Sequence, residues 1–409
     1  MRNLPALLAP ALLALLPAMS LAAPGAAAST RAIAALGSWR AQPHASLDDL
    51  RLRLPLSREE AERAWGRLAL DRQRELTIRY ADAVKAQKLT IGDKTLRWTH
   101  KDFGNAAPGQ RSLWISLHGG GNAPAEVNDG QWQNQLRLYE PAEGIYLTPR
   151  APTDTWNLWH EAHIDPLLQE LIDAQVAVNG VDPDKVFLMG YSAGGDGVWQ
   201  LAPRMADRFA AAAMMAGHPG DASLLPLRNL PFAIFVGGDD AAYDRNKLGA
   251  EKAAELDRLA AADPGGYVHM SRIYPRLPHW MNRKDAEAVP WMAHYRRNPW
   301  PARVIWVQDD VRSDRFYWLK IPAAATVKPG DTITASVVGH TITLSGAVPA
   351  GTMLRLSDRL LDLDRPVRVV VNGRTVHNGK VPRTARAIAE SLRERFDPNA
   401  VATASLTVG

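Results

Sequence analysis

The sequence predicts an α/β protein in which a mostly parallel sheet, with helices on both faces, is followed by a smaller β-rich, sandwich-like domain. Between residues 112 and 300, short continuous apolar runs alternate with helix-length segments, which is typical of parallel strands buried on both faces. After Pro299-Trp300-Pro301 the pattern changes to short strand-like runs divided by turns such as Asn372-Gly373. We therefore expect four regions, at 1–28, 29–105, 106–300 and 301–409.

The composition is that of a globular protein, with 46% hydrophobic and 22% charged residues among 409. The 48 Lys and Arg residues and the 43 Asp and Glu residues are spread along the chain without a basic block, so no nucleic-acid partner is expected. The chain has no cysteine, which excludes disulfides, thiolate metal sites and thiol nucleophiles. Any nucleophile must therefore be Ser, Thr, Lys or a carboxylate.

Residues 1–28 resemble a secretory signal peptide. Arg2 precedes an uncharged Leu/Ala/Pro-rich run, and both Ser20-Leu21-Ala22 and Ala26-Ala27-Ala28 fit a cleavage site. An uncleaved membrane anchor is the alternative, but prolines at 5, 10 and 17 and the lack of a basic flank favour cleavage. We expect export to the periplasm or the outside, with no stable membrane insertion after cleavage.

Residues 29–105 are expected to lead into the sheet. Ser57 and Glu60 form a capping-box signature, and apolar residues at helical spacing follow, which predicts a helix at about 57–88. Residues 89–103 alternate around Gly92-Asp93, which predicts a β-hairpin.

The remaining elements follow from apolar runs and the turns between them. Strands of the main sheet are expected at 113–117, 144–147, 186–189, 210–215, 232–236 and 267–273. The helices between them are expected at 128–140, 160–178, 193–206, 243–262 and 283–297. The C-terminal domain is expected to have strands at 316–321, 332–338, 341–344, 353–356, 367–371 and 402–408, with one helix at 384–395.

Gly190-Tyr191-Ser192-Ala193-Gly194 is a G-x-S-x-G motif between an expected strand and an expected helix. A sharp strand-to-helix turn leaves no room for side chains at the two flanking glycines. Such a turn would hold the Ser192 hydroxyl above the sheet edge, at the positive end of the next helix. Ser192 is therefore the candidate nucleophile.

His118-Gly119-Gly120-Gly121 closes the expected strand 113–117. Glycines at this place let backbone N–H groups approach a substrate oxygen, so Gly119, Gly120 and Ala193 are the candidate oxyanion-hole residues. A plain glycine turn or a phosphate loop is the alternative, but no Lys-Ser/Thr follows. His118 is expected to position this loop rather than to act as a base.

A serine nucleophile needs a base and an orienting acid. Strand 232–236 ends in Gly237-Gly238-Asp239-Asp240, with Asp244 close behind, so three aspartates are candidates for the acid. His279 is the one histidine in the loop after the expected last strand, and it is the candidate base. His294 falls in a helix-like stretch and is expected to be structural.

With these motifs, residues 106–300 resemble the α/β-hydrolase superfamily. They are similar to secreted serine esterases of the feruloyl esterase and polyhydroxybutyrate depolymerase type, and to prolyl-oligopeptidase-like hydrolases. The resemblance favours Asp240 as the acid and implies an acyl-enzyme mechanism without a cofactor. Relatives of the dienelactone hydrolase type use a cysteine nucleophile and do not fit. The region from about residue 301 resembles none of these families.

The segment 149–160 should emerge on the same face of the sheet as Ser192. Trp156, Trp159 and Trp280 are expected to overhang the site there and, with Tyr191, form a wall for an aromatic, acyl or sugar group. Core packing is the alternative for Trp156 and Trp280. For three tryptophans, Trp159, Trp132 and Trp199, core packing is favoured over a place in the wall.

His160-x-x-His163, with Glu161 and Asp165, has a spacing that could place two metal ligands on one helix face. No third ligand is evident, and a Ser-His-Asp enzyme needs no metal. We expect polar residues at a helix start and no metal site.

The sequence as a whole predicts a secreted serine hydrolase acting on a small-molecule or polymer-borne carboxylic ester. A prolyl-oligopeptidase-like peptidase is the first alternative, although too few residues precede residue 106 for a β-propeller. A non-catalytic binding protein on a hydrolase scaffold is the second. The C-terminal domain is expected to pack against the hydrolase domain, with polymer or partner binding as the alternative, and the sequence does not indicate an oligomeric state.

Overall fold

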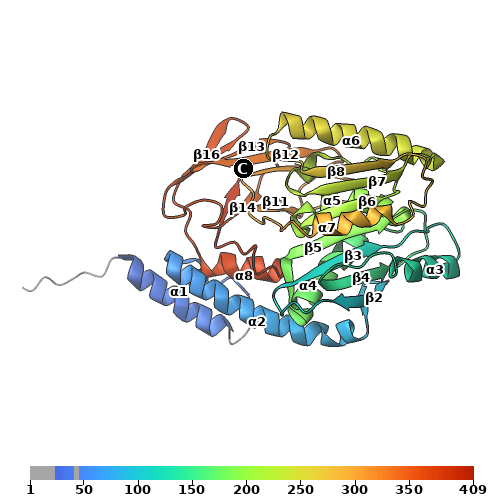
Figure 1. The fold of residues 1–409 in the computed structure, drawn as a ribbon. Helices are drawn as coiled ribbons and strands as arrows, with labels where there is room; N and C mark the ends of the chain where they lie inside the picture. The colour runs from blue at the N-terminus through green and yellow to red at the C-terminus, as the bar shows by residue number, and fades with distance from the viewer. Residues whose placement is uncertain (1–23, 41–45) are drawn as a thin grey trace, which may run out of the picture.

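The structure is a computed structural model that describes residues 24–40 and 46–409. It has one large sheet flanked by helices and, towards the C-terminus, two smaller sheets (Figure 1). The predicted fold class is therefore confirmed. No helix in the described ranges is long and apolar enough to cross a bilayer.

The large sheet has eight strands in the order β1-β2-β4-β3-β5-β6-β7-β8. The pairs β1–β2 and β2–β4 are antiparallel, and the other neighbours are parallel. The parallel strands therefore present their carboxyl ends at one edge of the sheet. The strands are β1 (Lys88–Ile91), β2 (Lys94–Phe103), β3 (Arg111–Leu117), β4 (Gly144–Arg150), β5 (Val181–Tyr191), β6 (Ala211–Met215), β7 (Phe232–Gly237) and β8 (His269–Tyr274).

Both faces of this sheet are buried. In β5, Val186 and Leu188 point into one apolar cluster, whereas Phe187 and Met189 point into the cluster on the other side. This double burial explains why the strands are continuous apolar runs in the sequence. The covering helices are α3 (Ala125–Gln135), α4 (Ile164–Asn179), α5 (Ala193–Arg204), α6 (Arg245–Ala262) and α7 (Ala288–Met292).

One predicted helix is wrong in extent. The expected helix 283–297 is a 3-10 turn, Lys284–Glu287, followed by the five-residue helix α7. His294 consequently lies in an exposed turn after α7 and not within a helix. The chain leaves the helix here and carries Arg297 to the buried carboxylate of Asp397 and the partly buried carboxylate of Asp184.

The N-terminal region follows the sequence expectation from residue 57 onward. The helix α2 (Arg58–Lys85) has the predicted capping box between Ser57 and Glu60, and it packs against α4 and α8 (Ala385–Glu394). An earlier helix, α1 (Pro24–Arg40), begins inside the predicted signal segment 1–28. The rest of that segment, residues 1–23, lies outside the described residues, so the signal peptide stays a prediction.

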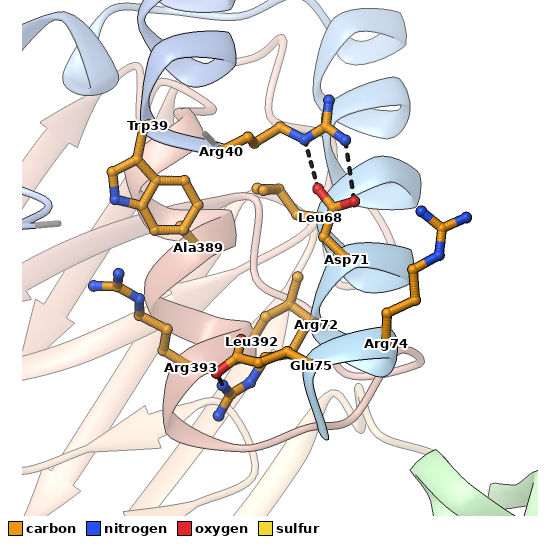
Figure 2. A pocket seen from close by; sticks show the side chains of 10 residues that line it. All are labelled: Trp39, Arg40, Leu68, Asp71, Arg72, Arg74, Glu75, Ala389, Leu392 and Arg393. Atoms are coloured by element: carbon orange, nitrogen blue, oxygen red, sulfur yellow. Dashed lines mark hydrogen bonds and ion pairs between the residues drawn. The ribbon is translucent and has the colours of Figure 1, made fainter. Parts of the chain in front are cut away.

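The C-terminal end of α1 is tied to α2. The Arg40 guanidinium donates two hydrogen bonds to the Asp71 carboxylate, at 2.5 and 3.0 Å (Figure 2). This pair lies at one side of a pocket of about 260 Å³ that α1, α2 and α8 enclose. Helices α1 and α8 lie on the side of the molecule away from α3, and α2 runs from there along α4 (Figure 1).

The C-terminal region has two facing sheets, in agreement with the predicted sandwich. The ring of Trp306 on one sheet stacks with that of Phe316 on the other, at a centroid distance of 6.0 Å. One sheet has the order β16 (Arg374–Gly379), β15 (Val367–Val371), β13 (Thr341–Gly346), β12 (Thr332–Val338) and β9 (Arg303–Val307). The other has the order β10 (Arg315–Phe316), β11 (Leu319–Lys320), β14 (Thr352–Leu356) and β17 (Ala404–Val408). The boundary at residue 301 stays a prediction.

A buried ion-pair network joins the C-terminal region to the large sheet. Arg297 donates to Asp397 at 2.5 and 3.0 Å and to Asp184 of β5 at 2.6 and 3.0 Å. Burial by itself raises the pKa of Asp397, but the neighbouring charge of Arg297, with Arg208 behind it, outweighs burial and holds this pKa well below its ordinary value. The Asp397 carboxylate is thus charged and paired in the folded protein.

We expect Asp397→Asn to lower the free energy of unfolding by about 3–5 kcal/mol, because it removes the carboxylate that the buried guanidiniums of Arg297 and Arg208 share. Denaturant unfolding of the full chain measures the effect. Asp310→Asn is the matched control, because Asp310 is exposed and 3.9 Å from Arg204, and it should cost less than about 1 kcal/mol.

The stability that the Asp397 carboxylate contributes depends on pH, and the direction of this dependence follows from its lowered pKa. A carboxyl group whose pKa is lowered by folding contributes stability above its unfolded pKa of about 4, and this stability is lost as the pH falls further. The difference in stability between the native protein and Asp397→Asn should therefore shrink in acid. A constant difference from neutral pH down to acid would contradict the assigned charge state.

Candidate active site

Ser192 lies on the sharp turn between β5 and α5, with a backbone φ of +60° and ψ of −124°. This strained conformation is the kind that packing imposes at functional sites. A Cβ on Gly190 would collide with the carbonyl of Gly194, and one on Gly194 would collide with the carbonyl of Leu117. The two motif glycines are thus required by close packing around the turn.

The structure brings Ser192, His279 and Asp240 together. The His279 Nε2 lies 3.0 Å from the Ser192 Oγ, and the His279 Nδ1 lies 2.7 Å from an Asp240 carboxylate oxygen. Asp240 is buried, whereas Asp239 and Asp244 are exposed and neither contacts His279. Of the three candidate aspartates, Asp240 is the one beside the imidazole. With the Nδ1 proton directed at the carboxylate, Nε2 can accept the serine proton.

The glycine loop after β3 lies directly beside the serine. A Cβ on Gly119 would be 3.1 Å from the Cβ of Ser192, so a larger residue would press on the serine. Gly120 has a φ of +110°, and a Cβ there would collide with Asn128. Ala193 is the first residue of α5, on the other side of Ser192. Gly119 and Ala193 therefore lie next to Ser192, and Gly120 lines the same cleft.

His118 holds this loop in place. Its Nε2 accepts a hydrogen bond from the Ala151 N–H at 3.1 Å, so the proton resides on Nδ1, which donates to the Gly119 carbonyl at 2.6 Å. Burial lowers the pKa of His118 to about 4, which keeps the ring neutral at neutral pH. These contacts match the sequence-based expectation that His118 positions the glycine loop.

Tyr191 joins the serine turn to the histidine loop. Its hydroxyl donates to the His279 carbonyl at 2.6 Å and accepts from the Met281 N–H at 3.0 Å. The side chain is buried, and its ring meets those of His279 and Trp280. Tyr191 therefore fixes the backbone on both sides of Trp280, and it also lines the cleft above Ser192.

A cleft of about 560 Å³ opens above Ser192 and His279. Gly119, Tyr191 and Trp280 line it on one side, and Trp280 is 44% exposed. The other side is formed by α3 and the turn after it. None of these residues was predicted from the sequence to line the cleft. The position of α3 directly after the glycine loop was the available signal. The lining residues from this side are Gln131, Asn134, Gln135, Arg137 and Leu138.

The predicted tryptophan wall is only partly correct. Trp159 is not part of the wall and lies in the core, the alternative that the sequence favours for it, because it is fully buried and its indole N–H donates to the His118 carbonyl at 2.8 Å. Trp156 is exposed, packs on Tyr243 and lies outside the lining of the cleft. Two further tryptophans have structural places: Trp132 donates to the Thr148 carbonyl, and Trp199 is fully buried.

The polar residues before α4 do not converge on a metal position. Asp165 accepts a hydrogen bond from Arg204 at 2.8 Å, and the Nδ1 of His163 lies 3.4 Å from Glu161. Burial lowers the pKa of both His160 and His163. Within the described ranges, no three His, Asp or Glu side chains are grouped so that they could hold a metal ion.

The strand order, the parallel core and the serine on the turn after β5 together define the fold. It is the α/β-hydrolase fold. The aspartate follows β7 and the histidine follows β8, each at the carboxyl edge of the α/β-hydrolase sheet.

No protein-family model matches this chain, and no curated protein matches it in sequence. Solved structures resemble about half of it. A thermostable esterase is 18% identical over 52% of this chain and 63% of its own, which is less than two thirds of its length, with a TM-score of 0.37. A mutant of the feruloyl esterase module from Clostridium thermocellum, in complex with sinapinate, is 15% identical over 51% of this chain and 86% of its own, with a TM-score of 0.35. Esterase 2 of Thermogutta terrifontis is 16% identical over 51% and 91%, with a TM-score of 0.34.

Proposed function

We propose that this protein is a serine hydrolase that cleaves carboxylic esters through an acyl-enzyme on Ser192. The observation that carries the proposal is the single imidazole, His279, with hydrogen-bond geometry to Ser192 on one nitrogen and to Asp240 on the other. This arrangement activates a serine hydroxyl as a nucleophile at neutral pH.

In the first half of the reaction, the Ser192 Oγ forms a bond to the ester carbonyl carbon while His279 takes the hydroxyl proton. Asp240 holds the imidazole and stabilises its cation. The negative charge on the former carbonyl oxygen is met by backbone N–H groups of Ala193 and of Gly119 or Gly120. The bond to the alkoxy oxygen then breaks, and His279 gives its proton to the leaving alcohol.

In the second half, a water molecule takes the place of the alcohol. His279 removes a proton from this water, whose oxygen attacks the acyl carbon. Collapse of the second tetrahedral intermediate breaks the bond to Ser192, and the proton on His279 returns to the Oγ. The products are one carboxylic acid and one alcohol, and the chain is restored to its starting state.

We also propose that the enzyme is exported, on the strength of its N-terminal segment. The order of one basic residue, an uncharged apolar run and small residues before a cleavage site supports this. Cleavage after Ala22 would leave helix α1 whole, whereas cleavage after Ala28 would remove its first turn. N-terminal sequencing of the protein recovered from the culture medium or periplasm tests both points.

The experiment that tests the activity compares p-nitrophenyl acetate, butyrate and octanoate with a panel of aminoacyl anilides. We expect ester turnover, with the acyl-length profile reporting the size of the cleft. Anilide turnover without an ester preference would favour the peptidase alternative instead. The described residues before β3 form helices and two strands rather than a β-propeller, which is why esters are the first choice.

Tyr191→Phe should lower kcat by roughly 10-fold while leaving KM for p-nitrophenyl acetate unchanged, because it removes the hydroxyl that fixes the His279 carbonyl. Steady-state kinetics that determines kcat and KM separately measures this effect. Tyr243→Phe is the matched control, because Tyr243 is exposed and its hydroxyl contacts neither His279 nor Met281. Equal kcat values for the two variants would show that Tyr191 has no positioning role.

A further inference from the structure

The charge lining the cleft is unbalanced. Among the described residues that line it, Arg137 is the one side chain with a permanent charge, and none is a carboxylate. Arg137 is exposed, and its guanidinium has no ion pair or hydrogen bond to another described residue. A fixed positive charge therefore faces the space that a substrate must enter.

The backbone that carries Arg137 is held firmly. The Arg137 N–H donates to the Asn134 carbonyl at 2.9 Å, and the Gln135 side chain donates to Ser116 at 2.8 Å. The Gln135 carbonyl accepts from the Tyr146 hydroxyl at 2.7 Å, and on the other side buried Tyr139 donates to Asp285. The guanidinium is thus attached to a rigid turn, although the side chain itself reaches solvent.

The surroundings of Arg137 are also suited to an anion. Gln131 and Asn134, one helical turn apart on α3, line the same cleft as Arg137 and carry amide groups that can donate hydrogen bonds. A guanidinium fork with neighbouring amide donors matches the planar oxygens of a carboxylate. Leu138 and Trp280 supply apolar surface for the rest of the ligand.

We propose that the cleft is selective for esters that carry a free carboxylate away from the scissile bond, and that Arg137 binds this carboxylate. The inference rests on the proposed esterase function and adds the substrate class to it. Arg137 acts here in binding and takes no part in bond cleavage. The expected signature is a change in KM for anionic esters alone.

The test uses probe pairs that differ only in charge. For a carboxylate on the alcohol side, 4-acetoxybenzoate is compared with 4-acetoxybenzamide. For a carboxylate on the acyl side, monoethyl adipate is compared with ethyl adipamate. The pair that shows the larger preference for the anionic member identifies which side of the ester faces Arg137.

Arg137→Gln should raise KM for the preferred anionic ester by about 10-fold and leave the neutral partner unchanged. Arg137→Lys should retain part of the preference, because it keeps the charge without the fork. Arg74→Gln makes the same change of charge at an exposed position on α2, away from the cleft, and should leave the preference intact. Salt at about 1 M should weaken the preference in the native protein by screening.

Two outcomes separate this inference from the proposed function. If Arg137→Gln hydrolyses anionic and neutral esters in the same ratio as the native protein, the inference is overturned while the esterase function stands. Arg137 would then serve only the carboxyl end of α3, and the variant would lose stability instead. If no ester of either kind is hydrolysed by the native protein, the proposed function itself fails.

Discussion

Ser192→Ala should lower kcat for p-nitrophenyl esters on the order of 10⁴- to 10⁶-fold, because no other group can take the place of the attacking oxygen. Residual turnover should come from the oxyanion donors and the cleft alone. Steady-state kinetics with a burst-phase measurement checks both points. The native protein should show a rapid release of p-nitrophenol that the variant lacks.

Folding of this variant is a necessary control. Ser192 is only partly buried, and removing its hydroxyl leaves the turn and the glycine contacts intact. Thermal unfolding should therefore match that of the native protein. Ser345→Ala, at an exposed position of β13, is the matched serine control and should keep full activity. Substantial turnover by a folded Ser192→Ala protein would rule out the serine mechanism.

Asp240→Asn should lower kcat by about 10⁴-fold. The amide of asparagine can donate to Nδ1, which moves the imidazole proton to Nε2 and removes the acceptor that the Ser192 hydroxyl needs. Asp239→Asn should leave kcat unchanged, because the Asp239 side chain is exposed and the hydrogen bonds of this residue are made by its backbone. Its N–H donates to the Leu277 carbonyl and its carbonyl accepts from the Ala241 N–H, each at 2.9 Å.

The pair is informative because the two aspartates are neighbours and the substitutions are identical. Charge removal near the site is common to both, so a difference between them reports contact with His279. The same loss of kcat in both variants would mean that the negative charge of the loop matters and that the hydrogen bond between Asp240 and His279 does not. A loss confined to Asp239→Asn would reverse the assignment of the acid.

The positions of the three candidate site residues could be predicted because each residue follows an expected strand of the parallel sheet. Parallel strands end at one edge, so residues after β5, β7 and β8 were bound to meet there. The glycines at 190 and 194 marked the turn, since only glycine fits such close packing. The choice between Asp239 and Asp240 could not be made from the residues alone, because it depends on the direction of the turn after β7.

The pocket walls were less predictable. Trp156 and Trp159 are three residues apart in one loop, yet one is exposed and the other fully buried under His118. Nothing in residue type or spacing separates them, because burial in a loop is decided by what packs over it. The α3 side of the cleft was missed for a related reason. Its polar residues match no catalytic or binding motif, and only their position after the glycine loop indicates that they lie near the site.

In the C-terminal region most strands could be predicted, but their partners could not. The strand β9 was missed, and the expected strand 316–321 is instead the short hairpin of β10 and β11. The turn at Asn372-Gly373 was predicted, but the strand after it, β16, was not, although β15 and β16 pair across this turn as a hairpin. The parallel pairing of β13 with β15, and the pairing of β9 with β12, join strands far apart in sequence. Such pairings join distant segments of the chain and leave no local pattern in the sequence. The buried Arg297 network was likewise invisible, because its members are scattered between residues 184 and 397.

The most direct test of the account is to trap the acyl-enzyme. The native protein is mixed with p-nitrophenyl acetate, quenched in acid during the burst, and digested for peptide mass spectrometry. We predict one acetyl group per chain, on the peptide that contains Ser192, and none on this peptide in Ser192→Ala. Ester hydrolysis with no acyl group on Ser192, or with the acyl group on a different residue, would contradict the central claim.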